Sequence, residues 1–438
     1  MASAGRDESR RLNERLHAVI PGGAHTYAKG DDQYPEGMAP VIERGAGAHV
    51  WDVDGNEYVE YGSGLRAVAL GHAHPLVNGA AAEAMARGTN FTRPSRLELE
   101  AAEALLELLP AADMVKFAKN GSDATTAAVK LARAATGRDL VAFCGDQPFF
   151  STDDWFIGRT AMPAGVPPAW RPFSVTFRYN DLESLATMFL EHPGRVACVV
   201  LEAATAVEPQ PGFLEGVRAL CDEHGALLVL DEMITGFRWH LGGAQHVYGI
   251  RPDLSTFGKA LGNGFAISAL AGRRDIMELG GIRCERERVF LLSTTHGAET
   301  HALAAAMAVM RIYREEAIVE RLEDRGRRLG AIVGDVIAAH GLEEHVLLLG
   351  RPSNMVFATL DADGQRSQPF RTLFLQGLVE GGVLGPSFVV SAALSDDDLD
   401  RTGEAVDRAL AGYAAALDGG IERWLRGRPV RPVMRPFA

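Results

Sequence analysis

Cysteine is scarce in this sequence. Its four cysteines include no closely spaced pair, which argues against a zinc site or a dithiol redox centre. Two of them, Cys198 and Cys221, lie in or beside apolar stretches and are expected to be small buried hydrophobic residues. The others are Cys144 and Cys284. We predict no metal site.

Basic residues are outnumbered, and long apolar runs are missing. Lysine and arginine number 44 against 57 acidic residues, so the formal net charge at pH 7 is −13. An acidic surface repels nucleic acids and anionic membranes, so neither is an expected partner. No apolar run approaches the roughly 18 residues of a membrane-spanning helix, and the charged first 16 residues show no signal-peptide core. We therefore expect a soluble, cytoplasmic protein.

The length and the apolar pattern indicate an α/β protein with two domains. The chain has 438 residues, more than a single hydrophobic core usually holds, so a large and a smaller domain are expected. Through the middle of the chain, short apolar runs alternate with segments of helical periodicity, which favours a mostly parallel sheet covered by helices. The predicted strands are residues 114–118, 140–144, 196–201, 226–230 and 269–272, and the predicted helices include 80–86, 96–109, 124–135 and 216–224.

The two ends of the chain carry different patterns. Residues 49–53 and 58–61 are predicted to form a hairpin around the turn Asp54-Gly55-Asn56. Beyond residue 311, a long charged helix, short strands and a closing helix follow. We expect residues 66–310 to form the large domain, and residues 1–65 and 311–438 to build a small α+β domain from both chain ends.

Two polar segments follow predicted strands, at the edge where open α/β sheets bind ligands. Residues 119–125 place Gly121 and Ser122 at the start of a helix, where N–H groups and a hydroxyl suit a phosphate. A plain helix cap explains this segment as well. Asp231 ends a buried apolar strand, where a carboxylate needs a cationic or protonated partner. That partner is a protonated pyridine nitrogen, a salt-bridging residue or a metal ion.

Lys259 stands in an apolar stretch that is rich in glycine, which leaves room for a bulky group on its amine. A partly buried lysine can act as a nucleophile, and a surface lysine in a glycine-rich loop is the alternative interpretation. Thr294, in a hydroxyl-rich loop, offers a second phosphate contact or a helix cap. Taken together and in this order, these features meet the needs of pyridoxal 5′-phosphate (PLP), which requires an anchored phosphate, a protonated ring nitrogen and a lysine for its aldehyde.

The sequence resembles the class III aminotransferases, a family of fold-type I PLP enzymes, and within it the glutamate-1-semialdehyde 2,1-aminomutase type and related aminotransferases. The resemblance is most specific in the run Asp-Glu-Met-Ile-Thr-Gly-Phe-Arg at residues 231–238, followed by Phe-Gly-Lys at 257–259. It implies a large domain with a mostly parallel, seven-stranded sheet between helices. Further matching segments are residues 20–23, 51–58, 71–72, 120–124, 242–245, 252–264 and Gly297.

The resemblance implies a role for each matching residue. Lys259 would carry the cofactor as a Schiff base and move protons, and Asp231 would pair with the pyridinium nitrogen. The implied assembly is a homodimer with shared active sites. The other implied contacts come from Gly121 and Ser122 (phosphate), Met233 (under the ring), Glu202 (near Asp231) and Thr294 (phosphate of the neighbouring subunit).

Two segments depart from the family pattern. Relatives usually place a Tyr-His pair soon after the strand that ends at Cys144, where this chain has two phenylalanines. We choose Phe149 as the aromatic residue that stacks on the cofactor ring, with Phe150 next. A place in the hydrophobic core is the alternative for Phe149. Residues 24–29, which lie near the substrate in the family, also differ, so the substrate is not identified. Candidate pocket residues are His25, Tyr27, Trp155 and Arg238. A structural role is open for each of them, and for Arg238 a structural ion pair within its loop is the favoured interpretation.

We expect an aminotransferase that moves an amino group from an amino donor to the carbonyl of a small metabolite. The alternatives within the family are an intramolecular aminomutase of the glutamate-1-semialdehyde type and an amino-acid racemase or epimerase. A non-catalytic binding protein with the same fold is a further alternative, against which the intact Lys259 and Asp231 argue.

Overall fold

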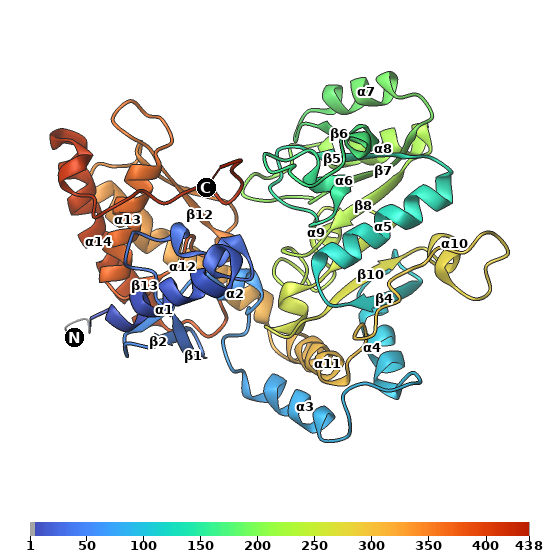
Figure 1. Ribbon diagram of the computed structural model, residues 1–438, viewed down its shortest axis with the longest axis horizontal. Coiled ribbons are helices and arrows are strands. Elements are labelled where there is room, and N and C mark those ends of the chain that lie inside the picture. Colours follow the sequence, from blue (N-terminus) through green and yellow to red (C-terminus); the bar gives the residue numbers. More distant parts are fainter. Residues whose placement is uncertain (1–4, 438) are drawn as a thin grey trace. The chain divides into compact units, whose positions relative to one another are not determined.

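The computed structural model describes residues 5–437, which form two compact units (Figure 1). The terminal unit contains residues 5–74 and 320–433, and the central unit contains residues 75–319 and 434–437. The predicted domain limits, after residues 65 and 310, lie nine residues before these unit limits, and residues 434–437 join the central unit. The division into functional domains stays a prediction.

The central unit is built on a seven-stranded sheet with the strand order β4-β10-β9-β8-β7-β5-β6. Only β10 runs antiparallel to its neighbours, and the other pairs are parallel. The predicted, mostly parallel sheet is therefore confirmed. The strands are β4 (Met114–Ala118), β5 (Leu140–Cys144), β6 (Ser174–Phe177), β7 (Val196–Leu201), β8 (Leu227–Asp231), β9 (Leu254–Phe257) and β10 (Ser268–Gly272).

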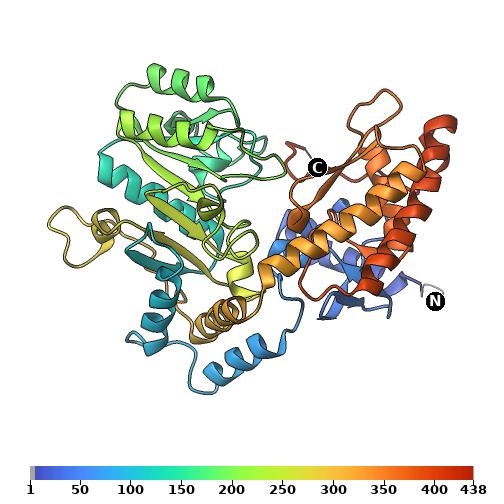
Figure 2. The same cartoon turned by 180° about the vertical axis from the view of Figure 1, so that it is seen from behind.

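Helices cover both faces of this sheet because its strands are apolar on both sides. Val141 and Phe143 of β5 belong to the core on the side of α5, which crosses in front of the strands in Figure 1. Leu140 and Ala142 belong to the core beneath α7 and α8, on the face that Figure 2 shows. The helices of this unit are α3 (Pro75–Met85), α4 (Arg96–Leu106), α5 (Gly121–Thr136), α6 (Asp154–Ile157), α7 (Leu182–Glu191), α8 (Phe213–His224), α9 (Ala244–Val247), α10 (Arg274–Met277) and α11 (Thr300–Glu315).

Two strands of the sheet escaped prediction. β6 reads Ser-Val-Thr-Phe and β9 reads Leu-Ser-Thr-Phe, so each has only four residues and two of the four carry hydroxyls. Neither forms the continuous apolar run that marks the other parallel strands. All four residues of β9 are nevertheless buried, since the strand lies between β8 and β10.

The terminal unit joins residues from both ends of the chain. The predicted hairpin is present, and Oδ1 of Asp52 accepts hydrogen bonds from the N–H groups of Asp54 and Asn56 across its turn. Strand β13 pairs in parallel with β3 and so attaches the later segment to the hairpin. The elements are α1 (Asp7–Val19), β1 (Ile42–Ala46), β2 (His49–Asp52), β3 (Glu57–Glu60), α2 (Ser63–Arg66), α12 (Ile318–Ala339), β11 (Val346–Leu349), β12 (Val356–Thr359), α13 (Gln368–Glu380), β13 (Val383–Leu384) and α14 (Asp396–Gly419).

Candidate active site

The predicted site residues of the central unit gather at one edge of the sheet. The carboxyl ends of β4, β7, β8 and β9 share this edge, because β10 alone runs in the opposite direction. Asp231 is the last residue of β8 and pairs in register with Thr256 of β9. Lys259 follows β9 by two residues, and Glu202 directly follows β7. The parallel topology therefore brings these side chains together from distant parts of the sequence.

Asp231 is a buried carboxylate with an incomplete set of partners. Only 4% of the residue is exposed. Its Oδ1 accepts hydrogen bonds from the N–H of Met233 (2.9 Å) and the hydroxyl of Thr256 (3.4 Å). Both of the hydrogen bonds from described residues end on Oδ1, which leaves Oδ2 for a further donor. Burial raises the pKa of Asp231 to about 6, and the nearby charge of Lys259 opposes this rise.

Lys259 sits in an unusual backbone conformation. Its φ is +46°, in the left-handed region that a residue with a side chain seldom adopts. Such conformations cost on the order of 1–3 kcal/mol and cluster at functional sites. The preceding residue must be small, since a Cβ on Gly258 would lie 2.7 Å from Sδ of Met233. The fold therefore holds this lysine in place against a local conformational preference.

Met233 fills the space between two loops of the site. Its side chain is buried, and a Cβ on Gly121 would lie 3.2 Å from its Sδ. The same sulfur lies close to Gly258, as described above. Because real Cβ atoms essentially never approach a neighbour to less than 3.0 Å, any side chain at Gly258 would displace Met233. The start of α5, the Lys259 loop and Met233 thus form one closely packed layer.

The start of α5 forms a cradle that suits an anion. We name Gly121 and Ser122 the phosphate cradle. Asn120 caps the helix, since its side-chain oxygen accepts the N–H of Asp123 at 3.0 Å. The hydroxyl oxygen of Ser122 accepts the N–H of Thr152 at 3.0 Å. The hydroxyl hydrogen of Ser122 stays available to an anion. The N–H groups in the first turn of α5 and the helix dipole also favour an anion at this place.

The two candidate stacking aromatics differ in exposure. Phe149 is 45% exposed, and its ring packs edge-on against Phe156 at 5.7 Å. Phe150 is fully buried in the core beside Phe143 and Phe156. Phe150 is therefore a core residue, while Phe149 keeps an accessible ring just beyond β5.

Glu202 is held by a residue that the sequence did not single out. The Gln147 carboxamide accepts the N–H of Glu202 at 2.8 Å and donates to its C=O at 2.7 Å. This pair of bonds fixes the end of β7 against the loop after β5. A polar residue three positions past a predicted strand is too common a signal to be noticed in the sequence.

Thr294 lies on the surface of the central unit. It is exposed in the loop before α11, and a Cβ on Gly297 would lie 3.1 Å from its Oγ1. The side chain of Asn90 donates a hydrogen bond to the C=O of Thr295 at 3.0 Å. The loop is thus attached to the segment between α3 and α4.

Two candidate pocket residues are buried in the central unit. Arg238 has no exposed surface. Trp155 is buried and donates its indole N–H to the hydroxyl of Thr126 at 2.9 Å. The other two candidates, His25 and Tyr27, are exposed residues of the terminal unit.

Glu232 is a second buried carboxylate next to Asp231, and no role was predicted for it. It accepts the N–H groups of Ala244 (2.7 Å) and Gln245 (2.8 Å) and the hydroxyl of Thr235. Burial raises its pKa to about 7 against the effect of these hydrogen bonds. Glu232 therefore attaches the loop at α9 to the strand end that carries Asp231.

The chain is similar to known proteins over most of its length. A family model described as aminotransferase class-III matches residues 32–339. Glutamate-1-semialdehyde 2,1-aminomutase from Syntrophomonas wolfei subsp. wolfei is 34% identical over 432 residues, covering 92% of this chain and 98% of that protein. The FumI protein of Sphingopyxis sp. MTA144, solved in its PLP internal aldimine form, gives a TM-score of 0.83 at 29% identity, with 97% and 99% covered. An omega-transaminase from Sphaerobacter thermophilus gives 0.81 at 26% identity, with 94% and 97% covered.

The raised pKa of Glu232 predicts a pH-dependent stability. The pKa of its carboxyl is about 4.5 in the unfolded chain and about 7 in the fold. The contribution of this carboxyl to the free energy of unfolding is therefore fully present below pH 4.5 and is lost as the pH rises to 7. Glu232→Gln cannot ionise and keeps that contribution. The unfolding free energy of the wild type, relative to the variant, should therefore fall by about 3 kcal/mol between pH 4.5 and 7.5. Urea unfolding of both proteins measures this difference. The exposed Glu215, changed to Gln, is the control and should show a flat difference, and parallel profiles for Glu232→Gln would contradict the prediction.

Proposed function

The chain belongs to the class III aminotransferase family, and we propose that Lys259 is the lysine on which its amino transfer depends. The protein is a PLP-dependent enzyme that moves an amino group from a donor to the carbonyl of an acceptor. The observation that carries the proposal for Lys259 is its place beside Asp231, at the sheet edge, in a backbone conformation that the surrounding structure enforces.

The residues present fit the cofactor. The phosphate cradle at the start of α5 would hold the phosphate, and Oδ2 of Asp231 would accept a hydrogen bond from the protonated ring nitrogen. The buried side chain of Met233 would lie under the ring. When bound, PLP supplies an aldehyde for amines and an electron-withdrawing ring that stabilises negative charge at the adjacent carbon. Asp231, buried and anionic, is the residue that would keep the ring nitrogen protonated.

Lys259 would perform two tasks in turnover. In the resting enzyme its Nζ would hold the cofactor at the aldehyde carbon, whose oxygen leaves as water, and the three nearby glycines leave room for the cofactor. Once free, the same amine would accept the proton that leaves Cα of the amino donor. Phe149, accessible beyond β5, would cover the ring, and Glu202 would lie on the Asp231 side.

A second candidate activity is supported by one comparison. Similarity to glutamate-1-semialdehyde 2,1-aminomutase extends over 98% of that protein at 34% identity. Such an enzyme moves the amino group within one molecule and needs no separate acceptor. Residues 24–29, which depart from the aminomutase pattern, favour the two-substrate reaction.

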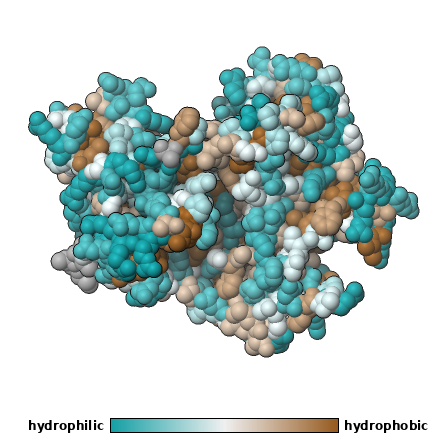
Figure 3. Space-filling view, in the orientation of Figure 1, coloured by the Kyte–Doolittle hydropathy of each residue, from teal (hydrophilic) through white to brown (hydrophobic). Residues whose placement is uncertain are grey.

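A homodimer with shared active sites is the proposed assembly. Exposed apolar side chains gather along α3, the following loop and α4, where Figure 3 shows moderately hydrophobic residues at the lower edge. The same loop bonds to the segment that carries Thr294, through Asn90 and through the C=O of Thr89, which accepts the N–H of Thr300. An interface here would bring Thr294 to the neighbouring subunit. The exposed apolar residues are Leu76, Met85, Phe91 and Leu99.

Lys259→Ala should abolish the covalent attachment of the cofactor. Borohydride treatment of the wild type should fix PLP to the peptide that contains Lys259, and mass spectrometry of a digest should locate it there. The variant should show no such adduct and should transfer amino groups about 10³-fold more slowly, because both the bond and the proton carrier are lost. Lys130→Ala, an exposed lysine of α5, should behave as the wild type. An adduct at an unchanged level in Lys259→Ala would refute the assignment.

The need for a second substrate separates the two candidate activities. With an amino donor alone, an aminotransferase should convert its bound cofactor once, to the pyridoxamine form, and then stop until a carbonyl acceptor is added. Stopped-flow absorbance and product analysis follow both stages. Continuous turnover of a single amino aldehyde without any acceptor would instead support the aminomutase hypothesis.

Phe91→Asp should separate the proposed dimer into monomers. Phe91 is exposed in the chain described here, so a carboxylate at this position costs little in the monomer but is unfavourable inside an apolar interface. Sedimentation velocity should give a dimer for the wild type and for Leu190→Asp, an exposed position on α7. A dimeric Phe91→Asp protein would place the interface elsewhere.

A further inference from the structure

A half-buried lysine just ahead of the phosphate cradle joins segments that are far apart in sequence. Lys119 directly follows β4, and 21% of its side chain is exposed. Its Nζ lies 2.7 Å from Oε2 of Glu299 and donates a hydrogen bond to the C=O of Ala266 at 3.2 Å. Hydrogen bonds between two charged groups are among the strongest that proteins form. One ammonium group therefore connects three stretches of chain.

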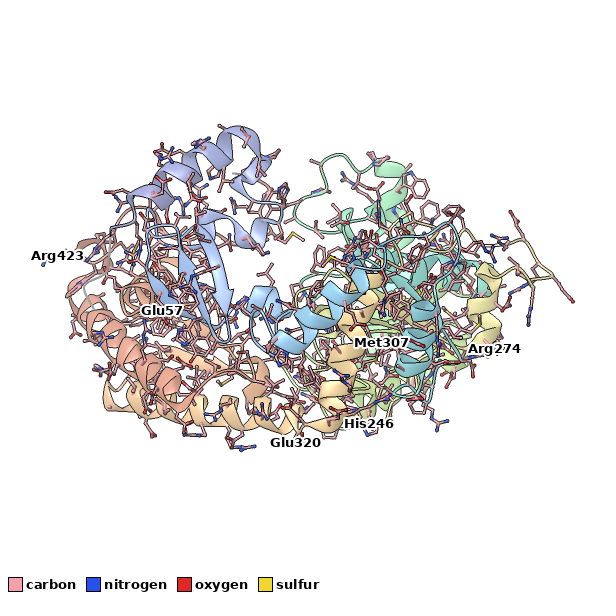
Figure 4. The ribbon with its side chains drawn as sticks, turned by 90° about the horizontal axis from the view of Figure 1, so that it is seen from below. Glu57, His246, Arg274, Met307, Glu320 and Arg423 are labelled. Carbon is pink, nitrogen blue, oxygen red and sulfur yellow. The ribbon has the colours of Figure 1, made fainter. Side chains whose placement is uncertain are left out.

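Each of these stretches carries a residue that we propose to bind the cofactor. The phosphate cradle begins two residues after Lys119. Ala266 belongs to the loop that begins at Lys259. Glu299 closes the loop that carries Thr294, and this residue directly precedes α11, whose Met307 is labelled in Figure 4.

The loop before α11 also packs on the end of β4. A Cβ on Gly297 would lie 3.5 Å from the C=O oxygen of Phe117 and 3.1 Å from Oγ1 of Thr294. The ion pair of Lys119 and the packing of Gly297 thus act at the same place. Together they fix the Thr294 loop against the strand that leads into the cradle.

The charge of Lys119 is compensated within this cluster. Among residues 5–437, Glu299 is the only acidic side chain that pairs with this ammonium group, and its hydrogen bond with Lys119 lowers the pKa of Glu299. Two histidines also approach this carboxylate, His296 at 3.2 Å and His301 at 3.8 Å. Because Glu299 stays ionised, Lys119 adds little net positive charge to the cradle. Lys119 therefore acts by holding the cradle in position.

We propose that Lys119 is a positioning residue for the cofactor phosphate, which it serves by tying the cradle to the Lys259 loop and to the Thr294 loop. This inference rests on the proposed function, because it requires that the cradle bind the phosphate of PLP. In the proposed dimer, Thr294 faces the neighbouring subunit. The Lys119–Glu299 pair then links the two phosphate sites of the dimer.

The test compares the release of two cofactors that differ only in the phosphate. Full-length enzyme is loaded with PLP or with pyridoxal, and loss of the visible absorbance after dilution gives each release rate. Lys119→Met should release PLP about tenfold faster than the wild type, since a charge-assisted hydrogen bond is lost. Release of pyridoxal should change less than about twofold, because it has no phosphate to position. Lys119→Arg should restore slow release of PLP.

Two further variants test whether Lys119 acts by positioning the cradle, by its positive charge, or only through the general stability of the protein. Glu299→Gln keeps the ammonium but removes its anionic partner, so it should also release PLP faster. Lys116→Met removes a partly buried lysine within β4 itself and should match the wild type. Should Lys119→Met fail to fold, as judged by its thermal midpoint, Glu299→Gln carries the same comparison of the two cofactors.

Three results would overturn the inference. They are unchanged release of PLP in Lys119→Met and Glu299→Gln, equal acceleration for PLP and pyridoxal, and slower release of PLP in Glu299→Gln, which would indicate simple charge attraction. A wild-type protein that binds no PLP would instead refute the proposed function itself. The two failures are therefore distinguishable.

Discussion

The burial of one carboxylate is the constraint on which the candidate site depends. Asp231 ends a strand that lies between two others in the middle of the sheet, so its charge is removed from water. Its two hydrogen bonds do not replace a full hydration shell, and its pKa rises to about 6. A cationic partner is the arrangement that stabilises such a group. The fold places Lys259 nearby and leaves Oδ2 for a protonated ligand.

Two kinds of contact shape the loops around Asp231, namely close packing at glycines and hydrogen bonds that hold a loop in place. Gly121 and Gly258 allow Met233 to lie against both loops, and a side chain at Gly258 would collide with its sulfur. Glu232 attaches the α9 loop to the same strand end through two backbone N–H groups. Backbone strain such as that at Lys259 persists where the surrounding structure holds a residue in place, and these contacts surround the Lys259 loop.

The site is assembled from segments that are widely separated in the chain. Lys119, Ala266 and Glu299 meet although more than 140 residues separate the first from each of the others. In the same way, Gln147 bonds to Glu202 across 55 residues. Parallel strands make such meetings possible because their carboxyl ends share one edge, whichever order they have in the sequence. The contacts of Lys119 consequently connect the phosphate cradle, the Lys259 loop and the exposed Thr294 loop.

The sequence alone determined the features that depend on residues close together in the chain. The apolar runs of β5, β7 and β8 marked a parallel sheet, and the family, the cofactor and the order of Gly121, Asp231 and Lys259 followed from short motifs. Tertiary structure decided which polar residues meet. It buried Arg238 and Trp155, exposed Phe149 while enclosing Phe150, and gave Glu232, Gln147 and Lys119 partners that no motif announces. The short strands β6 and β9 were missed for the same reason. A motif records what a residue can do with its neighbours in sequence, whereas burial and long-range partners depend on packing that only the folded chain defines.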